Sequence, residues 1–193
     1  MIYIIDHQDS FTHNVVHQFE NFDEVFCTNF NKINKKKLKE AEVIVFSPGP
    51  GAPKDYPISS QIYKRYKGKK KIIGICLGFQ QILHCENGKI IEQKKIYHGF
   101  QSKIKVISKN SLFKKNIQFT VGRYHSLKLK EPFAAKNFEI TMRCDISNTA
   151  MTIENNKEKI YGFQFHPESF LTENGNLLIK KIQIGRASCR ERV

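Results

Sequence analysis

The stretch "IIGICLGFQQIL", residues Ile72–Leu83, decides the fold. It opens with an apolar run typical of a buried strand, and a helix-like pattern follows from Gly78. Cys76 stands at the junction, with Gly74 two residues before it and Gly78 two residues after it. A nucleophile on a sharp strand-to-helix turn needs small residues at those two positions, because neighbouring backbone crowds them. A small buried cysteine is the simpler alternative, but the paired glycines favour a nucleophile whose thiolate is stabilised by the helix N-terminus.

The rest of the first half repeats this alternation of short apolar strands and helices. Asp9 or Ser10 is suited to cap the first helix, and Pro57 is suited to begin the second. The predicted strands are residues 2–5, 24–30, 41–46 and 70–75. This order predicts an α/β fold with an open, doubly wound, mostly parallel sheet.

The second half is dominated by strand-like runs that follow one another without helices between them. These runs are residues 102–108, 117–129, 138–144, 150–154 and 159–165. Asn155–Asn156 suits a hairpin turn between the last two, and a final helix is predicted over residues 176–182. We therefore expect antiparallel strands to be added to the parallel sheet.

The C-terminal segment "GRASCRERV", residues 185–193, differs from everything before it. It is rich in arginine and lacks apolar periodicity, as read-through from a cloning vector would. The chain of 193 residues is therefore interpreted as one domain over residues 1–184 followed by a vector-derived tail.

The chain is strongly basic, with a formal net charge of +14, and most of this charge is lysine. The lysines gather in residues 32–40, 67–71 and 92–95, without the aromatic interleaving of a nucleic-acid-binding surface. Solvated helix ends and loops are the favoured interpretation, and a surface for nucleic acid or an acidic partner is the alternative. The sequence has no membrane-spanning run, no secretory signal and no paired cysteine pattern, so we expect a cytoplasmic protein.

A thiol nucleophile needs a base, and "GFQFHPES" contains the best candidate. His166 closes an apolar strand, and Glu168 lies two residues further on, so both side chains face the same side of an extended chain. The carboxylate could then orient the imidazole toward the thiol. A histidine at the surface end of a strand is the alternative when this motif is considered alone.

The glycines of "SPGPGAP", residues 47–53, form a third candidate element. Gly49 and Gly51 follow an apolar strand, at the carboxyl edge where open α/β sheets bind ligands. Without side chains they would let backbone amides approach a substrate, although a plain proline-rich turn is the alternative. No Gly-Lys-Ser or Gly-Lys-Thr follows, so a phosphate loop is not predicted. His13 and His17 are one helical turn apart, but without a third ligand they favour a solvated helix face over a metal site.

Together and in this order, these motifs resemble the class I glutamine amidotransferases. The resemblance is strongest to the small glutaminase subunits of anthranilate synthase and aminodeoxychorismate synthase. It runs through "IIDHQDSFTHNVV", "SPGPGAP", "GICLGFQ", "GRYHSL" and "GFQFHPES". "DSFTHN" and "RYHSL" are what narrow it to the chorismate-using branch, while Phe79 and Phe100 depart from the histidine and lysine usual there.

The resemblance implies a flavodoxin-like fold and a role for each matching residue. Cys76 would be the nucleophile, His166 the general base and acid, and Glu168 the residue that orients His166. The remaining implied site residues are Gly49, Pro50 and Gly51 as a backbone wall, Leu77 with them in the oxyanion hole, Gln80 as a substrate contact, and Ser126 and Leu127 at the α-amino and carboxylate end of the substrate.

The resemblance also implies the substrate and the partner. The substrate would be L-glutamine, no metal or organic cofactor would be needed, and the ammonia would pass to a larger synthase subunit that binds chorismate. A stand-alone γ-glutamyl cysteine hydrolase remains an alternative, since it would keep Cys76 and His166 but need no partner. A basic nucleic-acid-binding protein is a further alternative, which only the composition supports.

Overall fold

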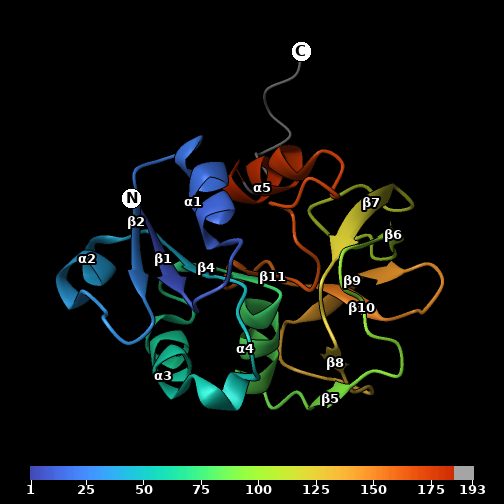
Figure 1. Cartoon of the computed structure of the whole chain (residues 1–193), viewed down its shortest axis with the longest axis horizontal. Coiled ribbons are helices and arrows are strands. Elements are labelled where there is room, and N and C mark those ends of the chain that lie inside the picture. The colour runs from blue at the N-terminus through green and yellow to red at the C-terminus, as the bar shows by residue number, and fades with distance from the viewer. Residues whose placement is uncertain (185–193) are drawn as a thin grey trace.

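A nine-stranded sheet in the order β2-β1-β3-β4-β11-β10-β9-β6-β7 crosses the computed structural model, which describes residues 1–184 (Figure 1). A separate two-stranded sheet pairs β5 with β8. The strands are β1 (Ile2–Asp6), β2 (Val25–Asn29), β3 (Val43–Phe46), β4 (Lys71–Ile75), β5 (Ile90–Glu92), β6 (Phe100–Val106), β7 (Gln118–Arg123), β8 (Leu127–Leu129), β9 (Glu139–Cys144), β10 (Ala150–Asn155) and β11 (Ile160–Phe163). The helices are α1 (Thr12–Glu20), α2 (Lys35–Glu40), α3 (Pro57–Tyr66), α4 (Leu77–Cys85) and α5 (Gly175–Ile184), with a 3-10 turn η1 (Pro53–Asp55).

The parallel half of the sheet, β2 through β11, is covered on both faces. Ile2 and Ile4 of β1 join a buried cluster with α1 and α5, whereas Tyr3 and Ile5 join a second cluster with α2, α3 and α4. Figure 1 shows α1 and α5 on one side of these strands and α3 and α4 on the other. Burial on both faces explains why β1, β3, β4 and β11 are nearly continuous apolar runs, whereas the edge strand β2 is only partly buried.

The antiparallel half begins at β11, which pairs in parallel with β4 and antiparallel with β10. Antiparallel pairs then connect β10 with β9, β9 with β6 and β6 with β7. The fold class predicted from the sequence is therefore confirmed. In the register of β4 and β11, Ile75 lies opposite Phe163, so the residues that follow these two strands leave the same edge of the sheet.

The single strand predicted over residues 117–129 is wrong, because the chain turns between β7 and β8. The side-chain Nε2 of Gln93 donates to the carbonyl of His125 at 2.6 Å, and His125 Nδ1 lies 2.8 Å from the carbonyl of Leu127. These contacts bend the backbone at residues 124–126. β8 consequently leaves the large sheet and pairs with β5.

The predicted cap of α1 is also wrong. Phe11, whose side chain accepts no hydrogen bond, occupies the N-cap position. The Asp9 carboxylate accepts from the N–H of Phe11 at 2.8 Å and so stabilises the turn before the helix. The hydroxyl of Thr12, the first helical residue, donates instead to Asp6 at 2.8 Å.

The proposed tail, residues 185–193, lies outside the described residues, so its vector origin stays a prediction. Within residues 1–184, no helix combines the length and apolar character that crossing a bilayer requires.

Candidate active site

Cys76 occupies the turn between β4 and α4, as the spacing of its glycines predicted. Its backbone has φ +52° and ψ −100°, a conformation that residues with side chains rarely adopt. A Cβ added to Gly74 would collide with the backbone of Gly78, and one added to Gly78 would collide with the carbonyl of Phe46. The turn therefore depends on both glycines, and it holds the thiol in one place above the strand.

The thiol is surrounded by the first residues that follow β11. The N–H of Cys76 donates to the carbonyl of Phe163 at 2.7 Å, and Gln164 Nε2 lies 3.9 Å from the Cys76 sulfur. Gln80 is buried one turn along α4 and donates through Nε2 to Gln164 Oε1 at 3.2 Å. Gln80 thus reaches the thiol by way of Gln164, and its contact with a substrate stays a prediction.

His166 and Glu168 form the buried pair that the sequence predicted. Their Nδ1 and Oε1 atoms are 2.6 Å apart, and the side chains are 2% and 0% exposed. A carboxylate can only accept here, so Nδ1 carries the proton and Nε2 is left for another partner. Within residues 1–184, Nε2 has no hydrogen-bond partner, and the His166 ring is held in place by the rings of Tyr124 and Phe11, with centroids 4.9 Å and 5.6 Å away.

The electrostatics of His166 favour its protonated form. Burial alone would lower the pKa of His166, but the charges of Glu168 and Cys76 outweigh it and raise this pKa well above the ordinary value. Cys76 therefore lies close enough to His166 to act on the imidazole. Such a pair is the starting state for nucleophilic attack by sulfur.

The predicted backbone wall packs directly on the first residue of α4. A Cβ on Gly49 would lie 2.6 Å from the side chain of Leu77, so only glycine fits there. Gly51 has φ +73°, and the hydroxyl of Tyr56 donates to the carbonyl of Pro50 at 2.9 Å. Leu77 begins α4, and the first N–H groups of a helix lack helical acceptors, so they are available to an oxyanion.

His7 supports this wall, and the sequence assigned it no role. It is fully buried, with Nδ1 3.1 Å from the carbonyl of Ser47 and Nε2 2.9 Å from the hydroxyl of Ser59. Burial lowers the pKa of His7 to about 4, so the imidazole is neutral near pH 7. The only signal in the sequence was its position after a buried strand, which many surface histidines share.

Ser126 and Leu127 lie in the turn that separates β7 from β8. Ser126 is exposed, and its carbonyl accepts from the N–H of Gln93 at 2.9 Å. A cavity of about 670 Å³ is lined both by Leu127 and by residues 52–54, which directly follow Gly51. Leu127 and the residues that follow the predicted wall therefore border one hollow, whose lining does not include the wall itself.

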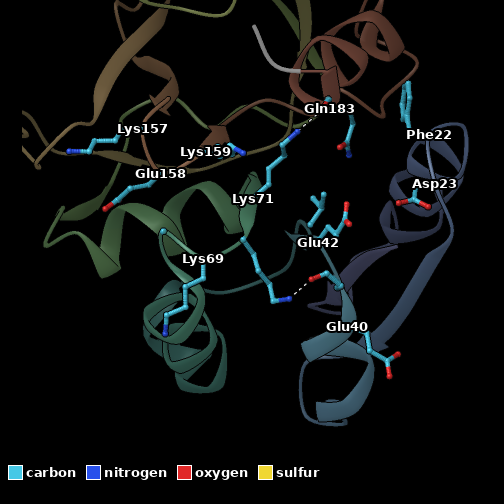
Figure 2. Close-up of a pocket in the computed structure, with 14 residues that line it drawn as sticks. Phe22, Asp23, Glu40, Glu42, Lys69, Lys71, Lys157, Glu158, Lys159 and Gln183 are labelled. Carbon is cyan, nitrogen blue, oxygen red and sulfur yellow. Dashed lines mark hydrogen bonds between the residues drawn. The ribbon is translucent and has the colours of Figure 1, made fainter. Parts of the chain in front are cut away.

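A second cavity, of about 790 Å³, opens at the opposite edge of the sheet, where the parallel strands begin (Figure 2). Lys71 and Lys159 line it together with Glu42. Lys71 Nζ donates to the carbonyls of Ile182 and Gln183 at 2.9 Å and 2.6 Å, and a cation there stabilises the C-terminal end of α5. This cavity lies at the edge of the sheet opposite Cys76, and Lys71 in its lining serves to hold the end of α5.

His13 and His17 are exposed on α1. Within residues 1–184, no group of three His, Cys, Asp or Glu side chains is placed to hold a metal ion.

The comparisons with known proteins agree with this geometry. The family model for class I glutamine amidotransferases matches residues 3–184. This chain belongs to the class I glutamine amidotransferase family. It is 38% identical over 182 residues to anthranilate synthase component 2 of Lactococcus lactis, with 93% of this chain and 92% of the relative covered. The same name is carried by a Helicobacter pylori relative that is 35% identical over 188 residues, with 93% and 94% covered.

Solved structures support the fold of this amidotransferase. A putative GMP synthase component from Thermoplasma acidophilum superposes with a TM-score of 0.80, covering 94% of this chain and 90% of its own. Its sequence is only 19% identical, so the likeness concerns the fold alone.

Proposed function

We propose that this amidotransferase hydrolyses the side-chain amide of L-glutamine through Cys76, His166 and Glu168. The observation that carries the proposal is the orientation of His166. Its Nδ1 is bound to Glu168 at 2.6 Å, while its Nε2, without a partner among residues 1–184, is coupled electrostatically to the strained Cys76.

The first half of the reaction forms a thioester and releases ammonia. The Cys76 thiolate attacks the amide carbon of glutamine, and the carbonyl oxygen becomes an oxyanion. Backbone N–H groups of Leu77 and of the wall over residues 49–51 would stabilise that charge. His166 donates its Nε2 proton to the amide nitrogen, the C–N bond breaks, and ammonia leaves.

The second half regenerates the enzyme. His166, now neutral, takes a proton from water through Nε2, and the hydroxide attacks the thioester carbon. The C–S bond breaks, glutamate leaves, and the thiolate again faces an imidazolium. Glu168 keeps Nδ1 protonated throughout, so the same nitrogen can act first as acid and then as base.

We further propose that the ammonia is delivered to a chorismate-binding synthase subunit. The names of the relatives, anthranilate synthase component 2, favour anthranilate over aminodeoxychorismate as the product, and hence tryptophan over folate synthesis. Phe100, which stands where the branch usually has lysine, is half exposed and available to a partner. Phe79, the other departure, is fully buried in the core cluster of α4 and is accommodated by packing.

The site is tested with an electrophilic glutamine analogue. It should label Cys76 and spare Cys27, Cys85 and Cys144, because among these four described cysteines only Cys76 interacts with His166, whose pKa is raised. Peptide mapping after labelling locates the adduct, and a Cys144→Ser variant serves as the control. An adduct on any other cysteine would overturn the assignment of the nucleophile.

The partner is tested by glutamate release with and without purified synthase large subunits, at saturating glutamine and with chorismate. An anthranilate synthase large subunit should bind and raise the rate. If only an aminodeoxychorismate synthase large subunit raises the rate, the product is aminodeoxychorismate rather than anthranilate. If neither subunit raises the rate, a stand-alone hydrolase is the better interpretation.

A further inference from the structure

Arg123, at the end of β7, is a buried cation outside the set of residues considered so far. Its side chain is 0% exposed, and within residues 1–184 it forms no ion pair with a carboxylate. Burying a guanidinium without a counter-charge costs free energy, so such a residue needs other compensating contacts. Those contacts show where it acts.

The guanidinium is held between an aromatic ring and an imidazole. Its central carbon lies 3.4 Å from the ring centroid of Tyr97, and Nε donates to His125 Nε2 at 3.0 Å. Because an arginine nitrogen can only donate, His125 Nε2 must accept and its Nδ1 must carry the proton. Nδ1 then donates to the carbonyl of Leu127 at 2.8 Å. A chain of hydrogen bonds thus runs in a fixed direction from Arg123 through His125 to Leu127.

The same short segment is tied to His166. The N–H of His166 donates to the carbonyl of Gly122 at 3.1 Å, and the ring of Tyr124 packs edge-on against the imidazole. Residues 122–127 therefore connect the base at one end with the turn of Ser126 and Leu127 at the other. A displacement of that turn by about 1 Å can cost roughly a hundredfold in rate where it positions a substrate.

We propose that Arg123 is a positioning residue that fixes the turn of Ser126 and Leu127 against the α-amino and carboxylate end of glutamine, acting through His125. The proposal rests on the proposed function, since it assumes that this turn holds glutamine. Arg123 itself touches no reacting atom.

His125 keeps one protonation state near pH 7, so its hydrogen bonds to Arg123 and Leu127 do not depend on pH in that range. Burial, followed by the charge of Arg123, lowers the pKa of His125 to about 3. The imidazole therefore stays neutral at any pH near 7, and it keeps one nitrogen for accepting and one for donating. Neutrality also avoids repulsion with the imidazolium of His166, whose charge acts on His125.

Two substitutions of His125 separate the two ends of the link. In His125→Asn, the amide nitrogen can take the place of Nδ1 and donate to Leu127. In His125→Gln, the amide reaches the place of Nε2 and can accept from Arg123, but the carbonyl of Leu127 loses its donor. His125→Asn therefore breaks the bond from Arg123, and His125→Gln breaks the bond to Leu127. If Arg123 acts through His125, each variant should raise the KM for glutamine about tenfold or more with kcat nearly unchanged. A wild-type KM in His125→Asn would show that Arg123 does not hold the turn.

Arg123→Met and Arg123→Lys test whether the hydrogen bond from Arg123 to His125 is needed to hold the turn. Arg123→Met should raise the KM about tenfold, and Arg123→Lys should restore part of it, because an ammonium can donate to His125. Arg143→Met is the matched control, because Arg143 of β9 contacts Glu131 and the carbonyl of Asn148 rather than His125 and should leave the KM unchanged. Alkylation of Cys76 by iodoacetamide, which needs the thiolate but not the glutamine end, should proceed equally in all variants.

The outcomes distinguish this inference from the function on which it rests. If the wild-type chain with its partner hydrolyses no glutamine, the proposed function fails and this inference fails with it. If wild type is active and His125→Gln and Arg123→Met keep the wild-type KM, only the positioning role is overturned. A fall in kcat and in the iodoacetamide rate at constant KM would also overturn it, because the segment would then support His166 rather than the turn.

Discussion

The two halves of the sheet position the residues of the proposed site by different means. At the end of β4, Cys76 is placed by contacts within a few residues, because Gly74 and Gly78 permit the turn that carries it. At the end of β7, the turn of Ser126 and Leu127 is held by the neighbouring His125 and by Gln93, which lies more than thirty residues earlier in the chain. An arrangement made by neighbouring residues can be predicted from the sequence. An arrangement that depends on distant segments is seen only in the structure.

The largest effect should come from His166, where the two halves meet. His166→Ala removes the base that activates sulfur and the acid that protonates ammonia, so the rate of glutamate release should fall roughly a thousandfold or more. Glu168→Gln should lose less, because an amide can still hold the ring without its charge. Steady-state assays at saturating glutamine measure both, and a His166→Ala variant as active as wild type would remove His166 from the mechanism.

Gly78→Ala should disrupt the turn between β4 and α4 that carries Cys76. The added Cβ would collide with the carbonyl of Phe46, which is backbone and cannot move aside cheaply, so we expect a loss of unfolding free energy of about 3 kcal/mol or more. Gly68→Ala is the matched control, because Gly68 has φ +70° but its nearest neighbour atoms are 4.0 Å away. It should lose only about 1 kcal/mol. Urea unfolding measures both, and equal losses would show that crowding at the turn does not matter.

Acid should weaken both sides of the site, since each has a neutral buried histidine. The pKa of His7 is lowered to about 4 in the folded chain, below the value of 6.5 expected when unfolded. Between these values the unfolded chain binds the proton and the folded chain does not, so stability falls as the pH falls from 6.5 to 4. The loss from His7 should be about 3 kcal/mol. The slope of the urea midpoint against pH should be shallower in His7→Gln, and an unchanged slope would contradict a neutral His7.

The smallest effect should come from removing residues 185–193. If they are vector-derived, a chain ending at residue 184 should keep its melting temperature and its glutamate release within experimental error. A loss of either would show that this segment belongs to the native protein and that the domain boundary was placed too early.

The sequence was informative wherever a few neighbouring residues determine the geometry. The strand, the turn and the helix of residues 72–83 could be predicted, and so could the pairing of His166 with Glu168, because residues two apart in an extended chain share a side. The break between β7 and β8 could not be predicted, since Gln93 lies far from His125 in the sequence. The buried His7 and Arg123 were missed for the same reason, because Ser59 and Tyr97, which contact them, are brought to them only by the fold.

The place of β11 in the sheet has a consequence for how the enzyme is made. Ile160 of β11 lies beside Ile72 of β4, so the last strand within residues 1–184 fills the gap between β4 and β10. Until the ribosome has added this strand, the edges of both neighbours stay unpaired and prone to aggregate. A nascent chain that ends at Glu158 should therefore be poorly soluble, which a sedimentation assay of the truncated chain can check. Because His166 follows β11 in the sequence, the proposed base would reach Cys76 only after this strand is made, and we expect no glutamate release from a chain that ends before β11.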